Sequence, residues 1–448
     1  MTKVITYGTY DLLHYGHIRL LERAKELGDY LIVGVTADDF DKTRGKINVQ
    51  QSLMERVEAI RALGIADEII IEEYEGQKID DIRRYDIDIF TVGSDWEGQF
   101  DYLNEYCKVV YLERTQGISS SELRAEKRKI QLGLVGESTV IQKFVNECQF
   151  VNGIEISGIY TSNRSLCAEM DNFSVMMKES YEELLDCVDA VYLISYPSLH
   201  YEQIKKALIH KKHVLCETPI VLSSKQISEL HALAKNNGCI LMDSIKTAYS
   251  TAYSRLLLLA KTGKIGKIVS VEATATSLRD IHEIQENRIE NKWNSICAWG
   301  PTVLLPVFQL LGTEYNKKII ASRFSNKEKT FDTFTKIDFI YEDSVASVKV
   351  GKGVKSEGAL IISGTQGYIY VPAPWWKTDY FEIRYENPAD NKRYFYQLDG
   401  EGIRYEIVAF IRAIETGKNT AYIERNVSDA ICCVIEDFYN RKDFIELK

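Results

Sequence analysis

Short apolar runs rich in β-branched residues alternate with amphipathic helical stretches through the first two thirds of the chain. Such alternation is typical of parallel β-sheets whose strands are joined by crossover helices. The pattern occurs as two successive series. In the first series the expected strands are 4–11, 30–38, 68–72, 88–95 and 109–115. The expected helices are 17–28, 54–63 and 119–130.

The second series begins at Ile130, directly after the charged segment 122–129. Its expected strands are 130–136, 153–161, 190–195, 213–218 and 239–244. From about Lys267 the strands become longer and alternate between apolar and polar positions, as an antiparallel sheet with one solvated face requires. These strands are 267–277, 319–325, 334–342, 344–351, 358–365 and 367–373. The segment 402–417 predicts an amphipathic helix that ends at Gly417.

These patterns predict the fold class. We expect an α/β protein with two doubly wound, Rossmann-like parallel-sheet domains, followed by an α+β domain with a large open, mainly antiparallel sheet. The expected domains are residues 1–128, 129–250 and 251–448, and the length of 448 residues agrees with about three folding units. We expect the last helices to pack back on the second domain.

The formal charge excludes one class of partner. Lysine and arginine number 55 and aspartate and glutamate 65, so the net charge is −10 and we expect no nucleic-acid binding by counterion release. No apolar run approaches the length of a membrane span and the N-terminus lacks signal-peptide features, so we expect a cytoplasmic protein without membrane insertion. The nine cysteines form no CxxC pair and no zinc-like cluster, which indicates reduced thiols and no metal site of this kind.

The first candidate site follows the first expected strand. His14 and His17 lie three residues apart at the expected start of a helix, so they share a face beside backbone N–H groups that the helix leaves unpaired. Such a position favours a bound phosphate, and two imidazoles could stabilise charge that develops on phosphate oxygens. Gly16 would let the backbone approach the ligand closely. Without further context, two histidines near a turn are more often surface or packing residues.

Two separate segments carry a resemblance to a known family. Residues 8–17 (GTYDLLHYGH) resemble the GT(F/Y)Dxx(H)xGH motif of the cytidylyltransferase-like nucleotidyltransferases, and residues 114–121 (RTQGISSS) resemble their second motif, RTxGIS(S/T)(S/T). The first domain, including residues 92–100 (VGSDWEGQF), is similar to the glycerol-3-phosphate cytidylyltransferases in length and order of elements. The resemblance implies attack by a polyol phosphate oxygen on the α-phosphorus of CTP, with Mg²⁺ neutralising the triphosphate and diphosphate leaving.

The resemblance also implies roles for single residues. The implied catalytic residues are His14, His17, Lys46 and Arg114. The residues implied in nucleotide binding are Thr9, Tyr10, Gly16, Asp95, Thr115, Ile118, Ser119 and Ser120. The residues implied on the acceptor side are Asp11, Asp38, Arg56 and Lys78. Each acceptor-side residue, and the loop lysine at position 46, could instead be a solvated charge.

Glycerol 3-phosphate is the acceptor that the resemblance implies first, with another polyol phosphate or phosphoethanolamine as the alternative. CDP-glycerol would then supply a surface polymer such as a teichoic acid or a capsule, an implication that rests on the family alone. A nucleotide sensor without catalysis is the alternative from another class of protein. The intact residues of both motifs argue against it.

The second candidate site follows the first strand of the second series. The loop 133–141 (GLVGESTVI) fits a dinucleotide-binding glycine fingerprint only in part, because Ser138 and Ile141 stand where the second and third glycines belong. Residues 189–219 resemble the glucose-fructose oxidoreductase and inositol dehydrogenase family in the patterns DAVYLISYPSLH and KHVLCETP. The resemblance covers residues 131–440 and implies a Rossmann domain followed by a large open-faced sheet.

Three departures from that family's pattern fall on its catalytic side. Thr218 stands where the family carries a lysine, and residues 298–302 (AWGPT) lack both the Asp and the His or Tyr of the family's DxGxH or DxGxY motif. Hydride transfer to a carbonyl needs a proton donor, and a threonine hydroxyl cannot serve as one near neutral pH. Nearby residues that could replace it are Lys246, Tyr249, His282 and Lys292.

The implied cofactor of this module is NADP(H), because Ser162 and Arg164 follow the second strand where an NAD-binding protein carries an acid. The implied cofactor-binding residues are Gly133, Gly136, Ser138, Ser162, Arg164 and Glu217. Two hypotheses stay open: a reductase that makes the polyol phosphate used by the first domain, or a module that keeps the fold without redox catalysis. The missing lysine favours the second. We also expect small-molecule substrates and a homo-oligomer.

Overall fold

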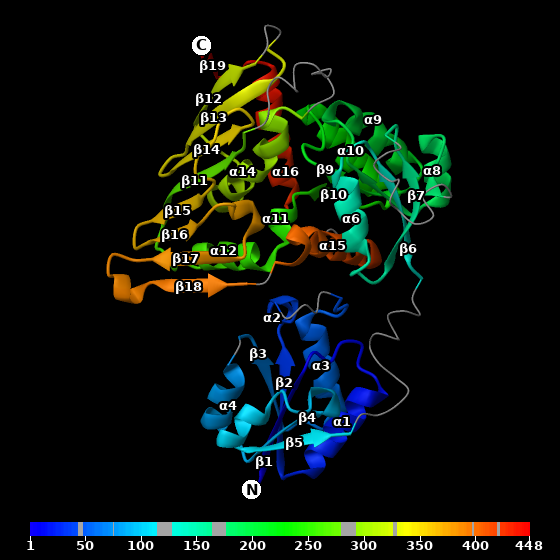
Figure 1. Ribbon diagram of the computed structural model, residues 1–448, viewed down its shortest axis with the longest axis vertical. Helices are drawn as coiled ribbons and strands as arrows, with labels where there is room; N and C mark the ends of the chain where they lie inside the picture. Colours follow the sequence, from blue (N-terminus) through cyan, green and yellow to red (C-terminus); the bar gives the residue numbers. More distant parts are fainter. Residues whose placement is uncertain are drawn as a thin grey trace. The chain divides into compact units, whose positions relative to one another are not determined.

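The chain folds into two compact units, Met1–Lys129 and Ile130–Lys448, in the computed structural model (Figure 1). The structure describes residues 1–43, 48–74, 76–113, 128–163, 176–278, 293–325, 329–396, 398–418 and 422–448. Over these ranges, no helix combines the length and the apolar character needed to cross a membrane.

The first unit is built on a five-stranded parallel sheet of order β3-β2-β1-β4-β5. Its strands are β1 (Lys3–Gly8), β2 (Tyr30–Thr36), β3 (Glu68–Glu72), β4 (Ile89–Gly93) and β5 (Lys108–Leu112). Its described helices are α1 (Tyr15–Glu26), α2 (Asp38–Thr43), α3 (Leu53–Leu63), α4 (Gln77–Tyr85), η1 (Ser94–Trp96) and η2 (Asp101–Glu105). Because β2 and β4 lie on opposite sides of β1, the strand order reverses there, and ligands bind at the carboxyl ends of strands at such a switch point.

Helices cover both faces of this sheet. Val4 of β1 packs with Leu21 of α1 and Val57 of α3, whereas its neighbour Ile5 packs with Ile82 of α4 on the opposite face. Successive side chains of a strand point to opposite faces, so a sheet buried on both sides needs an unbroken apolar run. This requirement explains the sequence pattern of β1, and the short helices α2 and α4 are additions that the pattern did not predict.

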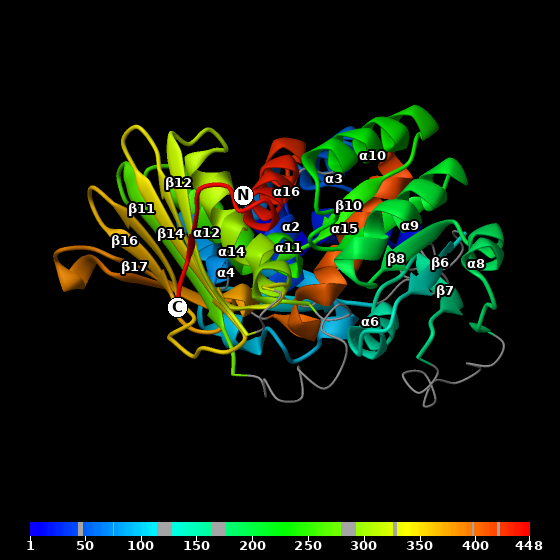
Figure 2. The same cartoon turned by 90° about the horizontal axis from the view of Figure 1, so that it is seen from above.

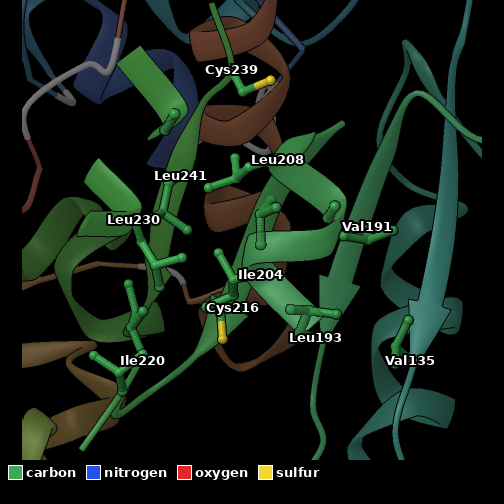
Figure 3. Close-up of a cluster of buried hydrophobic side chains, with 14 of the residues drawn as sticks. Val135, Val191, Leu193, Ile204, Leu208, Cys216, Ile220, Leu230, Cys239 and Leu241 are labelled. Atoms are coloured by element: carbon green, nitrogen blue, oxygen red, sulfur yellow. The ribbon is translucent and has the colours of Figure 1, made fainter. Parts of the chain in front are cut away.

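The second unit begins with another parallel sheet, of order β10-β9-β8-β6-β7. Its strands are β6 (Ile130–Val135), β7 (Ile154–Tyr160), β8 (Ala190–Leu193), β9 (His213–Glu217) and β10 (Leu241–Ser244). The helices that follow them are α6 (Val140–Cys148), α8 (Tyr181–Cys187), α9 (Pro197–Ile209), α10 (Ser224–Asn237) and α11 (Lys246–Tyr249). Figure 3 shows part of its core, where Leu193 of β8, Ile204 and Leu208 of α9, and Leu230 of α10 gather.

A nine-stranded sheet of order β18-β17-β16-β15-β11-β14-β13-β12-β19 follows. Its strands are β11 (Ile268–Thr276), β12 (Lys317–Phe324), β13 (Asp332–Ile340), β14 (Val345–Gly351), β15 (Leu360–Gly364), β16 (Tyr368–Val371), β17 (Tyr380–Arg384), β18 (Lys392–Phe395) and β19 (Phe444–Glu446). The β11–β14 and β12–β19 pairs are parallel, and the other neighbouring pairs are antiparallel. The predicted fold class, two parallel-sheet domains and a large, mainly antiparallel sheet, is therefore confirmed.

The second unit contains further described helices. They are α12 (Thr251–Lys261), α14 (Ser295–Leu311), η5 (Trp375–Lys377), η6 (Pro388–Asp390), η7 (Asp399–Gly402), α15 (Ile403–Thr416) and α16 (Arg425–Tyr439). Figure 2 shows α14 and α16 between the nine-stranded sheet and the parallel sheet. Glu436 of α16 accepts hydrogen bonds from the backbone N and Oγ of Ser224 on α10, at 3.2 and 2.6 Å. Arg404 of α15 pairs with Glu147 of α6.

Candidate functional site

The loop that follows β1 has an unusual backbone. Tyr10 and Leu12 adopt φ angles of 53° and 48°, in the left-handed region that residues other than glycine rarely occupy. The buried Tyr10 ring folds back over Gly8, where an added Cβ would lie 2.9 Å from its Cζ atom. Gly8 is therefore needed for this close approach, and the ring fixes the course of the loop.

The two motif histidines lie together at the start of α1. His14 is the N-cap residue, and its Nδ1 accepts a hydrogen bond from the backbone N–H of Gly16 at 3.1 Å. A neutral His14 therefore carries its proton on Nε2. The His17 ring stacks on that of His14 with a centroid separation of 3.8 Å, and Tyr10 meets His17 edge-on at 5.5 Å. The loop thus presents two oriented imidazoles at the positive end of a helix dipole.

Arg56 of α3, predicted on the acceptor side, is completely buried. Its Nη1 donates hydrogen bonds to the carbonyl oxygens of Thr9, at 2.6 Å, and Thr36, at 2.9 Å. Its Nη2 donates to the Asp38 carboxylate, another predicted acceptor-side residue. The guanidinium therefore ties the loop after β1 to the end of β2, while its predicted contact with the acceptor stays a prediction.

The other predicted residues of this edge also hold loops in place. The Asp11 carboxylate accepts hydrogen bonds from the backbone N–H groups of Gln50 and Gln51, at 3.0 and 2.9 Å, which attaches the segment before α3 to the motif loop. Thr9 Oγ1 donates to the buried Asp41 of α2 at 2.8 Å. The motif loop is thus held from two neighbouring segments.

Lys78 and Asp95 come from α4 and η1, the elements before and after β4 in the chain. Lys78 of α4 is buried, forms an ion pair with Glu72 and places its Nζ 4.6 Å from the centroid of the Tyr7 ring. Asp95 follows β4 directly in η1 and is exposed. The remaining predicted residues of this site lie outside the described residues: Lys46, Arg114, Thr115, Ile118, Ser119 and Ser120.

In the second unit, the glycine loop lies at the carboxyl ends of β6 and its two neighbours. Gly136 adopts φ 132° and donates its N–H to the Tyr160 carbonyl of β7 at 3.2 Å. An added Cβ there would lie 2.5 Å from the backbone carbon of Ile194, just after β8. Ser138, which replaces a fingerprint glycine, accepts the N–H of Val140 on its Oγ at 3.3 Å. Gly133 packs under Leu184, which an added Cβ would approach to 3.0 Å.

Glu137 is a residue of this loop that the sequence analysis did not select. Its Oε1 accepts hydrogen bonds from Oγ and the backbone N of Ser162, at 3.0 and 3.4 Å, at the end of β7. The sequence signal was available, since Glu137 follows Gly136 directly in the glycine fingerprint. Arg164 lies outside the described residues.

Two carboxyl groups lie close together here, the partly buried Glu217 at the end of β9 and the buried Glu406 of α15. Glu217 Oε1 accepts hydrogen bonds from Tyr192, at 2.5 Å, and from Ser244, at 3.1 Å, and the same Ser244 hydroxyl lies 2.9 Å from Glu406 Oε1. Burial raises the pKa of Glu217, and burial together with the Glu217 charge raises that of Glu406 well above its usual range. Thr218, the next residue in the chain, is buried and stands at the position where the family carries a lysine.

The residues that could replace this lysine differ in their surroundings. Tyr249 is buried and its hydroxyl donates to the Asp243 carbonyl at 2.5 Å, so its proton is already used. Lys246 is partly exposed and pairs with Glu401 at 3.1 Å, as Lys377 does at 2.7 Å. The hydrogen bond from Lys377, together with Lys246, lowers the pKa of Glu401 to about 2. His282 and Lys292 lie outside the described residues, and residues 298–302 lie within α14.

Comparison with known proteins finds relatives of the first unit. The family model described as Cytidylyltransferase-like matches residues 5–126. A glycerol-3-phosphate cytidylyltransferase of Bacillus spizizenii is 50% identical over 126 residues, which are 28% of this chain and 97% of that protein. The Staphylococcus aureus protein of the same name is 48% identical over 126 residues, 28% of this chain and 95% of that protein. The chain belongs to the cytidylyltransferase-like family.

The second unit of this cytidylyltransferase-like protein matches a different family. The model described as Oxidoreductase family, NAD-binding Rossmann fold, covers residues 130–244. A scyllo-inositol 2-dehydrogenase (NADP(+)) of Bacillus subtilis is 28% identical over 131 residues, 28% of this chain and 40% of that protein. A 3-ketoreductase from Actinomadura kijaniata, solved with NADP and TDP-benzene, is 18% identical with a TM-score of 0.62 and matches 72% of this chain and 100% of its own. The second unit is therefore an oxidoreductase-like module, fused to the cytidylyltransferase-like unit.

Proposed function

We propose that the first unit transfers CMP from CTP to glycerol 3-phosphate, giving CDP-glycerol and diphosphate. The observation that carries this proposal is the stacked pair of His14 and His17 at the N-terminus of α1, within a unit that is about half identical to glycerol-3-phosphate cytidylyltransferases. In the reaction, a phosphate oxygen of glycerol 3-phosphate forms a bond to the α-phosphorus, and the bond from that phosphorus to the bridging oxygen of diphosphate breaks.

The two histidines act on the charge that this step develops. The Gly16 N–H fixes the ring orientation of His14, so its Nε2–H can donate to a phosphate oxygen. His17, held by stacking on His14 and by the edge of Tyr10, is oriented before the substrate arrives. Oriented donors need no reorganisation as charge grows on the phosphate, which is the main protein contribution to phosphoryl-type transfer.

We propose that Mg²⁺ enters this site with CTP. Among the residues that the structure describes, no three or more His, Cys, Asp or Glu side chains form a metal-binding group. Mg²⁺ commonly takes most of its ligands from substrate phosphates and water, so the triphosphate itself fits as its principal ligand. The ion would supply neutralisation of the triphosphate charge in a protein whose net charge is −10.

The acceptor is tested by offering CTP with glycerol 3-phosphate, other polyol phosphates and phosphoethanolamine in competition, and identifying the nucleotide products by mass. Phosphoethanolamine is included because an ethanolamine-phosphate cytidylyltransferase of Dictyostelium discoideum is 34% identical over 129 residues, 27% of this chain and 35% of that protein. CDP-glycerol is expected as the main product. A different CDP-alcohol as the main product would overturn the choice of acceptor, and no CDP-alcohol at all would overturn CMP transfer.

For the second unit we propose a module that binds a nicotinamide dinucleotide but has lost redox catalysis. Thr218 cannot act as a proton donor near neutral pH. The Tyr249 hydroxyl donates its hydrogen to the Asp243 carbonyl, and Lys246 forms an ion pair with Glu401. The alternative is reduction of a keto-polyol phosphate, and it depends on Lys246, whose charge lies close enough to Glu217 to act on its pKa. Oxidation of NADH or NADPH by a panel of keto-polyol phosphates would establish this alternative, and no oxidation is expected.

We further propose that CDP-glycerol made here serves the synthesis of a glycerol-phosphate surface polymer. This proposal rests on the resemblance to the glycerol-3-phosphate cytidylyltransferases, since CDP-glycerol is an activated form of glycerol phosphate. The protein would then act in the cytoplasm, where CTP is available, and self-association stays a prediction.

A further inference from the structure

We propose that Glu137 makes the second unit select NAD(H) over NADP(H). The inference rests on the proposed dinucleotide binding and deepens it, because it assigns the form of the cofactor. It also reverses the expectation drawn from Arg164, which favoured NADP(H).

The carboxylate of Glu137 lies where the adenosine ribose of a dinucleotide is expected. In a doubly wound sheet the dinucleotide crosses the carboxyl ends of the strands at the switch point, and an acid at the end of the second strand binds the ribose 2′-hydroxyl. In this sheet β6 is the first strand along the chain and β7 the second, and β7 is followed by Thr161, Ser162 and Asn163, none of which is acidic. The acid comes from the glycine loop instead.

Two observations place Glu137 at this point. Its Oε1 accepts hydrogen bonds from both the Oγ and the backbone N of Ser162, directly after β7. Its charge also contributes to the raised pKa of Tyr196, after burial as the larger cause, and Tyr196 follows β8 at the start of α9. Glu137 therefore lies in the crevice between the ends of β7 and β8, on either side of β6.

The described part of the glycine loop after β6 is compatible with a bound dinucleotide. Gly136 has no room for a side chain against Ile194, so the loop passes close to the strand ends. Its continuation leads into α6, nine residues long, whose first N–H groups can face a diphosphate. Ser138, which stands in place of a glycine, adds no charge to the loop.

The charge of Glu137 discriminates between the two cofactors. The ribose 2′-hydroxyl of NAD(H) can donate a hydrogen bond to the carboxylate, whereas the 2′-phosphate of NADP(H) would bring a second negative charge against it. Among the described residues, no lysine or arginine forms an ion pair with Glu137, so the repulsion is not offset there. Juxtaposed like charges cost enough to give a preference of roughly tenfold or more for NAD(H).

The test is a titration of the full-length protein with NADH and with NADPH. Binding is monitored by the fluorescence of the bound nicotinamide. The wild-type protein is expected to bind NADH at least about tenfold more tightly. Glu137→Gln keeps a hydrogen-bond acceptor for Ser162 and removes the charge, so NADPH binding is expected to strengthen and the preference to shrink. Glu155→Gln is the matched control, because it removes an exposed charge at the opposite end of β7, where Glu155 pairs in register with Gln131.

The possible outcomes distinguish the cofactor preference set by Glu137 from dinucleotide binding itself. Binding of neither cofactor to the wild-type protein would overturn dinucleotide binding itself. Tighter binding of NADPH than of NADH, abolished by Arg164→Gln, would overturn the inference and leave dinucleotide binding standing. An unchanged ratio of the two dissociation constants in Glu137→Gln, with near-ultraviolet circular dichroism like that of the wild type, would also overturn it. The same change of ratio in Glu155→Gln would show a general charge effect and contradict the role of Glu137.

Discussion

At the scale of single residues, the candidate transferase site depends on side chains that are oriented by their neighbours. His14 is fixed through Nδ1 by the Gly16 N–H, and His17 is fixed by two aromatic contacts. Arg56, buried without any exposed surface, joins the loop that carries them to the end of β2. The histidines therefore interact with substrate in our account, whereas Arg56 positions the loop.

Replacing either histidine is expected to lower turnover without unfolding the protein. His14→Ala and His17→Ala each remove one oriented donor, and loss of one such donor commonly costs roughly 10²–10³-fold in kcat. Steady-state diphosphate release measures the change. His210→Ala, an exposed histidine at the end of α9, is the control and should leave the rate unchanged. Turnover retained within a few-fold in both site variants would contradict the assigned roles.

Replacing Arg56 is expected to destabilise the first unit. Arg56→Met removes the guanidinium that pairs with the buried Asp41 and the partly buried Asp38, and breaking a buried pair in this way costs about 3–5 kcal/mol. Hydrogen exchange of peptides from residues 4–13 and 48–56 should accelerate. Arg61→Met on the same helix removes only an exposed pair with Glu58 and should leave exchange unchanged. Equal exchange in the two variants would refute the positioning role.

At the scale of elements, both candidate sites lie at the carboxyl ends of parallel strands. These edges can be predicted from the sequence because apolar strands and the motifs after them are local in sequence, as the segment 8–17 shows. The burial of Arg56 and the attachment of Asp11 to Gln50 and Gln51 cannot, because those contacts join segments far apart in the chain. Glu137 stands directly beside the glycine fingerprint in the sequence, but its contact with Ser162, just after β7, also joins separate segments of the chain.

A buried carboxyl that joins two elements makes the stability of the second unit depend on pH. Asp332 of β13 accepts hydrogen bonds from Thr335, at 2.6 Å, and from the N–H of Ile296 at the start of α14, at 3.2 Å. Burial raises the pKa of Asp332 to about 6. The folded state therefore holds this proton more tightly than the unfolded chain, whose Asp pKa is about 3.9. The contribution of Asp332 to stability is present below about pH 4 and is lost as the pH rises to about 6.

Asp332→Asn is expected to make the stability of the second unit depend less on pH between about pH 4 and pH 6. It is also expected to raise that stability at pH 7, because it removes a buried charge. The measurement is the midpoint of urea unfolding at a series of pH values from 4 to 8. Unfolding is monitored by the tryptophan fluorescence of the full chain. Asp338→Asn on the same strand, where Asp338 forms a partly exposed pair with Lys336, should leave the slope unchanged. A wild-type slope retained in Asp332→Asn would show that another group titrates.

At the scale of the whole molecule, the protein combines two units that have separate relatives. The matched cytidylyltransferases correspond almost in full to residues 1–129, and the structural neighbours of the second unit correspond in full to the rest of the chain. Each unit also has its own sheets and core. We infer that the chemistry of CMP transfer belongs to the first unit alone.

Residues 1–129 expressed alone should therefore fold and release diphosphate from CTP with a kcat equal to that of the full chain. The reason is that all residues assigned to this reaction lie within the unit and its core is complete without the rest. Steady-state kinetics on both proteins make the comparison. Loss of activity in a folded fragment, as judged by circular dichroism, would mean that the second unit contributes to catalysis.

The central claim is that this protein joins CMP to glycerol 3-phosphate through His14 and His17. It is tested most directly by measuring CDP-glycerol and diphosphate in one reaction of the full-length protein with CTP, glycerol 3-phosphate and Mg²⁺. The account predicts that the two products form in equal amounts and that the double variant His14→Ala, His17→Ala forms neither at a comparable rate. Absence of CDP-glycerol from the wild-type reaction, or its undiminished formation by the double variant, would contradict the account.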